Sequence, residues 1–149
     1  MKKEFYSTSA QMTEDIGKAL ACELLQSGAS RAFVAMRGEM GVGKTAFCRG
    51  FASALGIQGV KSPTYTVVNE HKSDIKALFH FDMYRIADAD DLYSIGYYDY
   101  LERDGYILCE WSENIEDEIP DGAITVTVLR VDGDEGARTV IIENGGELC

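Results

Sequence analysis

The sequence predicts one α/β domain over residues 1–149, in which helices sandwich a mixed β-sheet and a β-hairpin lies near the C-terminus. Three observations predict this fold class. Strand-like and helix-like segments alternate in the first half of the chain, and hairpin-like pairs of strands follow in the second half. The chain has 149 residues, 46% of them apolar, and only two prolines, which suits a single core without a proline-rich linker.

In the first half, apolar periodicity and capping residues define the segments. Ser7, Thr8 and Ser9 offer N-caps before a helical pattern that Gly28 would end. The continuous apolar run at 32–36 is typical of a strand buried on both faces. The expected elements are a strand at 4–6, a helix over about 11–27, a strand at 32–36 and a helix over 45–55.

In the second half, short alternating runs separated by turn residues predict hairpins. An acidic stretch interrupted at Gly96 is typical of short helices, and a purely apolar run at 106–109 predicts a second buried strand. The expected elements are an antiparallel pair at 65–70 and 77–82, short helices within 88–101, the strand at 106–109 and a hairpin from 124–131 and 138–142.

The charge is unevenly distributed along the chain. The total is −11, from 14 basic and 25 acidic residues, and residues 86–121 alone hold twelve acidic residues and one basic residue. Residues 31–85 hold eight basic and four acidic residues, so this stretch attracts anions. The overall charge argues against a chain that binds nucleic acid on its own. The acidic stretch is expected to face solvent or a basic protein surface.

Other bulk features narrow the class of protein. No apolar run approaches the length of about 18 residues that a transmembrane helix needs. Residues 1–6 are not followed by the apolar segment of a secretory signal. The four cysteines form no Cys-x-x-Cys pair, which predicts reduced cytosolic thiols and argues against a zinc site.

One motif carries the functional prediction, because residues 38–45 match the phosphate-loop pattern G-x-x-x-x-G-K-[ST] at every fixed position. The backbone N–H groups of such a loop surround phosphates, its lysine reaches the β- and γ-phosphates, and its hydroxyl binds Mg²⁺. The buried strand and the helix that this chemistry requires are both predicted around the loop. The candidate nucleotide-binding residues are Gly38, Glu39, Met40, Gly41, Val42, Gly43, Lys44 and Thr45.

Two acidic residues end predicted strands near this loop. Glu110 follows the apolar run at 106–109 and is the preferred magnesium ligand, whereas Asp82 would orient the attacking water or support the metal. The residue pattern alone allows these two roles to be exchanged. Ser62 and Thr64 lie in a segment stiffened by Pro63, where their hydroxyls could meet the γ-phosphate or Mg²⁺, although the residues alone favour a plain turn followed by a strand.

Several further residues allow two interpretations each. His80, Asp82 and Tyr84 share one face of an extended segment. A zinc site at His80 and Asp82 is not expected, because His71 is the only other histidine and no cysteine has suitable spacing. Arg85 either pairs with the acidic residues downstream, which we favour, or acts as an arginine finger. Trp111 is either a core residue, which is the default, or a lid over the site. The chain has no guanine-specificity motif, which favours adenine as the base.

These motifs together resemble one family. The residues that carry the resemblance are Gly-Glu-Met-Gly-Val-Gly-Lys-Thr (38–45), Ser-Pro-Thr-Tyr (62–65), His-Phe-Asp-Met-Tyr-Arg (80–85), Leu-Tyr-Ser-Ile-Gly (92–96) and Glu-Trp (110–111). Their order and spacing over residues 5–120 are similar to those of the TsaE (YjeE) family of bacterial ATPases.

The resemblance implies a cytoplasmic protein that binds ATP and Mg²⁺ and hydrolyses ATP slowly until partners stimulate it. Its partners would be the TsaB and TsaD subunits, which install threonylcarbamoyl on adenosine 37 of tRNAs that read ANN codons, and which this ATPase would reset between turnovers. Contact with tRNA would be indirect. By matching position, Lys44, Thr64 and Asp82 would serve catalysis, and Thr45 and Glu110 would bind Mg²⁺. Ala10 and Arg138 are family-like candidates for contacts to the base.

Two other classes remain as alternatives. A small P-loop metabolite kinase would normally carry a lid with arginines, whereas this chain has only Arg103, Arg130 and Arg138 after Arg85, amid excess acid. A nucleotide-dependent binding module would hold the nucleotide without useful hydrolysis.

Overall fold

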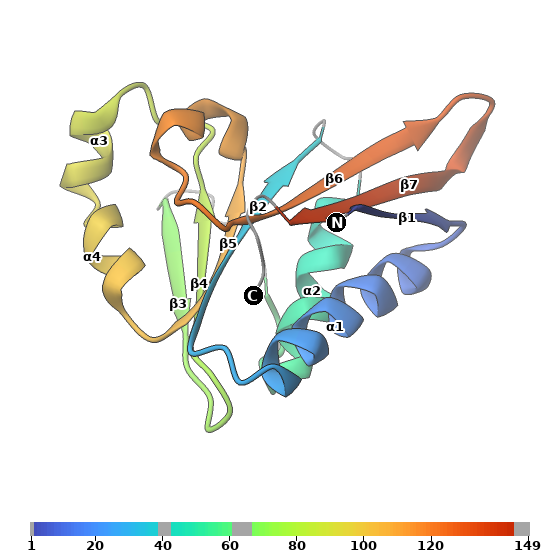
Figure 1. Cartoon of the computed structure of the whole chain (residues 1–149). Coiled ribbons are helices and arrows are strands. Elements are labelled where there is room, and N and C mark those ends of the chain that lie inside the picture. Colours follow the sequence, from blue (N-terminus) through green and yellow to red (C-terminus); the bar gives the residue numbers. More distant parts are fainter. Residues whose placement is uncertain (1, 39–42, 61–66, 145–149) are drawn as a thin grey trace.

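The computed structural model describes residues 2–38, 43–60 and 67–144. These residues form one seven-stranded mixed sheet in the order β1-β7-β6-β2-β5-β4-β3 (Figure 1). The central strands β6, β2, β5 and β4 run parallel, and β7, β1 and β3 add antiparallel strands at the two sides. The strands are β1 (Lys2–Ser7), β2 (Arg31–Arg37), β3 (Val68–His71), β4 (Leu78–Asp82), β5 (Gly105–Glu110), β6 (Ile124–Val131) and β7 (Asp134–Asn144).

Helices cover both faces of this sheet, as the predicted sandwich requires. The long pair α1 and α2 packs together on one side, and the short helices lie on the other (Figure 1). Ser9 caps α1 by accepting a hydrogen bond from the backbone N–H of Met12, as the serine-rich start of this segment predicts. The helices are α1 (Ala10–Gln26), α2 (Lys44–Ala54), α3 (Ala89–Ser94), α4 (Tyr97–Glu102) and a 3₁₀ segment η1 (Ser112–Glu118).

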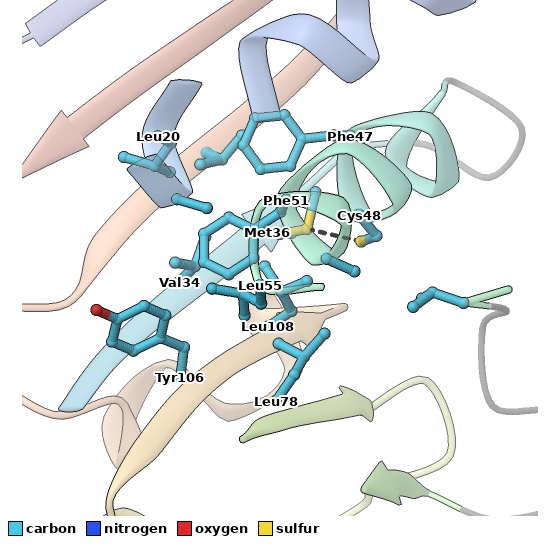
Figure 2. Close-up of a cluster of buried hydrophobic side chains, with 14 of the residues drawn as sticks. Leu20, Val34, Met36, Phe47, Cys48, Phe51, Leu55, Leu78, Tyr106 and Leu108 are labelled. Atoms are coloured by element: carbon cyan, nitrogen blue, oxygen red, sulfur yellow. Dashed lines mark hydrogen bonds between the residues drawn. The ribbon is translucent and has the colours of Figure 1, made fainter. Parts of the chain in front are cut away.

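The central strands divide the core into two clusters by the alternation of their side chains. On β2, Val34 and Met36 face α2, where Phe47 and Phe51 fill the space between sheet and helix (Figure 2). On the same strand, Phe33 belongs to the second cluster beneath the short helices. Both faces of the strand are therefore buried, which explains the continuous apolar run.

The predicted fold class is confirmed, with two local differences. β7 starts at Asp134 instead of residue 138, because Asp132 and Gly133 form a two-residue turn in which Gly133 has a positive φ of 82°. An Asp-Gly pair suits such a turn, so the interval between the two strands is shorter than expected. The 3₁₀ segment η1 was not predicted from the sequence. Part of the expected strand at 65–70 lies outside the described residues.

The close packing of α1 on α2 depends on two glycines. A Cβ atom at Gly50 would lie 1.8 Å from the carbonyl oxygen of Glu14, and one at Gly17 would lie 2.2 Å from that of Phe47. Both obstacles are backbone atoms of a packed helix, so neither can move aside without separating the two helices.

We therefore expect Gly50→Ala to lower the free energy of unfolding by about 3 kcal/mol or more, despite the higher helix propensity of alanine. Urea denaturation followed by circular dichroism measures this change. Gly136→Ala is the matched control, because the new Cβ would meet only a side-chain oxygen of Asp134 at 3.7 Å. A Gly50→Ala protein within about 0.5 kcal/mol of the original would contradict this account of the packing.

Candidate functional site

The candidate site lies where the parallel strands end and α2 begins. β2 ends at Arg37, Gly38 follows it, and α2 starts at Lys44, so the strand and the helix that the phosphate-loop motif requires flank the motif. Gly43 forms the N-cap of α2 with φ 110°, a conformation that favours glycine. Of the candidate loop residues, Glu39, Met40, Gly41 and Val42 lie outside the described residues.

Lys44 points back toward Gly38, which follows the end of β2. Its side chain is buried, with a relative exposure of only 5%, and its Nζ donates a hydrogen bond of 2.8 Å to the carbonyl oxygen of Gly38. The same Nζ lies 4.6 Å from the centroid of the Trp111 ring. The ammonium group is thus held beside Gly38, between the end of β2 and the start of α2, where it can bind an incoming phosphate. Thr45 follows it in the first turn of α2 and is half-buried.

Asp82 and Glu110 lie side by side, as their positions at strand ends predict. β4 and β5 are parallel neighbours, and their register pairs Asp82 directly with Glu110. Glu110 is buried, and its Oε2 lies 2.6 Å from Nε2 of the fully buried His80. A carboxylate only accepts hydrogen bonds, so an ionised Glu110 requires the proton of His80 on Nε2. His80 thereby fixes the orientation of Glu110.

The electrostatics of Asp82 reflect this crowding of charge. Burial of the carboxyl group raises its pKa above the ordinary value, and the negative charge of Glu110 adds to the increase. The backbone N–H of Tyr84, which donates to Oδ1 at 2.9 Å, acts in the opposite direction, as do His80 and Lys44. The two adjacent carboxylates and the hydroxyl of Thr45, in the first turn of α2, are oxygen donors of the kind that Mg²⁺ prefers, so these residues suit that ion.

The raised pKa of Asp82 carries a prediction for stability. In the unfolded chain the Asp82 carboxyl has its ordinary pKa of 3.8, which is lower than its pKa in the folded protein. Ionisation of Asp82 therefore lowers the free energy of unfolding as the pH rises above 3.8. Asp82→Asn should therefore unfold at a higher urea concentration than the original protein at pH 7. The gain should shrink as the pH falls below 3.8, where the carboxyl becomes protonated in both states. An asparagine variant that is less stable at pH 7 would contradict this assignment.

Trp111 is part of the site and also contacts the core. It is the one non-glycine residue with a positive φ, 58°, in the described ranges. Its ring packs against Tyr84, with 5.0 Å between ring centroids, as well as lying under Lys44. Backbone strain of this kind is typical of functional sites. Trp111 is therefore more than the plain core residue of the default expectation.

Arg85 is exposed and forms no ion pair within the described ranges. The expected pairing of Arg85 with acidic residues downstream is therefore not found there.

Sequence reasoning missed one residue close to this site. Cys48, one turn into α2, lies with His80 and Glu110 in a buried group whose sulfur, nitrogen and oxygen atoms are all within 4.8 Å of one another. The expectation that no cysteine has suitable spacing for His80 was wrong, because the packing of α2 on β4 brings together residues far apart in sequence. Burial raises the pKa of the Cys48 thiol, and the charge of Glu110 raises it further.

The remaining candidates lie elsewhere or outside the described residues. Thr64 falls in the undescribed range 61–66, so its catalytic role stays a prediction. Arg138 on β7 pairs in register with Ser7, the last residue of β1, and Ala10 begins α1 three residues later, so both candidates for base contacts lie near the end of β1. Nη1 of Arg138 donates to the carbonyl oxygens of Glu135 and Ala137 at 2.6 and 2.7 Å. The contacts of Ala10 and Arg138 with the nucleotide base stay predictions.

The fold and this arrangement of residues define the chain as a protein of the P-loop NTPase class. The family model described as "Threonylcarbamoyl adenosine biosynthesis protein TsaE" matches residues 7–140, and the chain belongs to this family. The predicted resemblance is thereby confirmed. No helix within the described ranges is long and apolar enough to cross a membrane.

Individual relatives agree with this assignment. The tRNA threonylcarbamoyladenosine biosynthesis protein TsaE of Haemophilus influenzae is 38% identical over 133 residues, which cover 88% of this chain and 84% of that protein. The protein of the same name from Treponema pallidum is 34% identical over 91% of this chain and 96% of its own. The crystal structure of Bacillus subtilis YdiB has the same fold, with a TM-score of 0.77 and 25% identity over 98% of this chain and 87% of that one.

Proposed function

We propose that this protein is a Mg²⁺-dependent ATPase that supports the synthesis of threonylcarbamoyladenosine in tRNA by acting on a TsaB–TsaD complex. Membership of the TsaE family supports the pathway. The observation that carries the proposed chemistry is the convergence of buried Lys44 with the register-paired acids Asp82 and Glu110 at the start of α2.

The residues divide the work by their chemistry. Lys44 would bind the β- and γ-phosphates, and the N-terminus of α2 would add its partial positive charge. Thr45 and Glu110 would hold Mg²⁺, which would supply electrostatic stabilisation to the phosphates. Asp82 lies beside Glu110 and would orient the attacking water, while Thr64 would contribute from the segment of the sequence between α2 and β3. Ala10 and Arg138 stay candidates for contacts to adenine.

Phosphate release from ATP tests this function. We expect slow hydrolysis by the protein alone and faster hydrolysis when TsaB and TsaD are added, with dependence on Mg²⁺ in both cases. Transfer of the phosphate to a small metabolite would instead support a kinase. The structure gives that alternative little support, because Arg103, one of the few arginines after residue 85, forms an ion pair with Glu70 at 3.0 Å. Binding of ATP without hydrolysis under any of these conditions would support a binding module.

The acidic stretch 86–121 is the proposed docking face for a basic surface of the partners. Asp88 and Asp91 serve the fold, since Asp88 caps α3 by accepting from the N–H of Asp91, and Asp91 accepts from the N–H of Ala87. A test of docking should therefore avoid both residues. Asp90, Glu113 and Asp117 are exposed alternatives.

We expect the triple change of Asp90, Glu113 and Asp117 to lysine to weaken binding to TsaB–TsaD by about tenfold or more, because each change replaces attraction with repulsion. Titration of labelled protein with the complex measures this effect. The basal ATPase rate without partners is the control and should change little. Unaltered affinity would place the docking face elsewhere.

A further inference from the structure

A buried group of metal-binding side chains lies behind the proposed nucleotide site. It consists of Cys48 from α2, His80 from β4 and Glu110 from β5, and the exposures of these residues are 0%, 0% and 5%. One donor atom from each residue lies within 4.8 Å of the other two. The three donors come from different elements of the fold, so tertiary packing alone assembles them.

The chemistry of these donors differs from that of a magnesium site. Mg²⁺ is bound by oxygen atoms and does not favour sulfur or imidazole nitrogen, whereas zinc and similar cations bind thiolate, imidazole and carboxylate together. In a tetrahedral zinc site, the ligand bonds of 2.0–2.3 Å place the donor atoms roughly 3.3–3.6 Å apart. The present spacing of up to 4.8 Å therefore needs only small side-chain adjustments to enclose such an ion.

Two further observations indicate that the group is incompletely satisfied without a ligand. Nδ1 of His80 is buried and has no hydrogen-bond partner in the described ranges, which is unusual for a nitrogen inside a protein. Among the described residues, the sulfur of Cys48 has one weak partner, the thioether of Met36 at 3.4 Å, and Figure 2 shows this contact between the two sulfur atoms. A cation bound by Nε2 would replace the hydrogen bond of 2.6 Å to Glu110, the imidazole proton would move to Nδ1, and the sulfur would gain a stronger partner.

We propose that Cys48, His80 and Glu110 form a binding site for a thiophilic divalent cation of the zinc class. Binding would release the proton of the Cys48 thiol to solvent, since the thiolate is the ligand. Glu110 is also the proposed ligand of Mg²⁺, so the two ions would compete for one carboxylate. This second statement rests on the proposed function: zinc would inhibit ATP hydrolysis by withdrawing Glu110 from the nucleotide site.

Cobalt(II) is the spectroscopic probe for the site, because it replaces zinc and its bond to thiolate gives a charge-transfer band in the near ultraviolet. The experiment uses the full chain with Cys22→Ser and Cys149→Ser, which leaves Cys48 and Cys109 as its cysteines. We expect one equivalent of Co²⁺ to produce the thiolate band and one equivalent of Zn²⁺ to abolish it. Adding Cys48→Ser should remove the band and weaken binding by about tenfold or more.

Cys109→Ser in the same background is the matched control. Cys109 is as buried as Cys48 but belongs to the core cluster on the opposite face of the sheet, so its replacement should leave the band in place. In that variant Cys48 is the only cysteine, and X-ray absorption of its zinc-loaded form should show one sulfur ligand with nitrogen or oxygen ligands. This measurement shows whether Cys48 binds the metal even if the Cys48→Ser protein does not fold.

The proposal is overturned if bound Co²⁺ shows no thiolate band, if the band survives in Cys48→Ser, or if the absorption data show no sulfur ligand. A separate assay tests the competition. Zinc should slow ATP hydrolysis by the original protein at limiting Mg²⁺, and Cys48→Ser should resist this inhibition. If the original protein does not hydrolyse ATP, the proposed function fails while the cobalt spectrum still decides whether the metal site exists.

Discussion

Replacing Lys44 with alanine is expected to abolish ATP hydrolysis, with a loss of at least about 10²-fold in rate, because the variant lacks the cation that would bind the β- and γ-phosphates. Lys44 is buried and already directed at Gly38 with a hydrogen bond of 2.8 Å, so its positive charge is preorganised for a phosphate. Affinity for Mg²⁺–ATP, measured by calorimetry, should fall together with the rate.

Lys76→Ala is the matched control for this change. Nζ of Lys76 also lies over an aromatic ring, 5.2 Å from the centroid of Tyr106, but Tyr106 lies at the other end of β5 from Glu110. Both variants therefore lose a lysine and its contact with an aromatic ring. They differ in that Lys44 belongs to the candidate site and Lys76 does not. Comparable hydrolysis by Lys44→Ala and Lys76→Ala would refute the role of Lys44.

Replacing Glu110 separates the role of its charge from its role in the fold. In Glu110→Gln the side-chain oxygen can still accept the hydrogen bond from His80, so the protein should keep most of its stability. The lost negative charge should lower Mg²⁺-dependent hydrolysis by about 10²-fold or more, with a higher Mg²⁺ requirement. In Glu110→Ala the buried His80 loses its partner at 2.6 Å, and we expect an additional cost of about 1–3 kcal/mol in unfolding free energy.

Phosphate release as a function of Mg²⁺ concentration, together with urea denaturation, distinguishes these effects. Glu113→Gln serves as the control, because Glu113 is an exposed acid of the same stretch and lies outside the site. A Glu110→Gln protein with the original Mg²⁺ dependence would show that Asp82 holds the ion in its place. The sequence alone allows this exchange of roles.

Local patterns in the sequence were sufficient for most of the fold and for the main site residues. The apolar run ending at Met36 predicts a strand buried on both faces, and the phosphate-loop motif places Lys44 at the start of a helix. The positions of Asp82 and Glu110 at the ends of two buried strands predict that they meet, and the register of β4 and β5 confirms it. These inferences need only the geometry of adjacent segments.

Features that depend on packing between distant segments could not be predicted in this way. The approach of Cys48 to His80 depends on how α2 lies against β4, and no spacing in the sequence encodes it. The positive φ of Trp111 has no local signal either, because tryptophan rarely adopts it. Likewise, an aspartate that caps α3, such as Asp88, cannot be distinguished by composition from an exposed acid that is available to a partner.

The central claim is that ATP hydrolysis at Lys44, Asp82 and Glu110 sustains repeated turnover of the TsaB–TsaD complex. The most direct test measures threonylcarbamoyladenosine formed in tRNA over many turnovers by that complex, supplied with this protein or with Lys44→Ala. We predict that the original protein supports continued product formation, whereas Lys44→Ala stops it at about one product per complex or fewer. Equal product formation with the two proteins would contradict the claim.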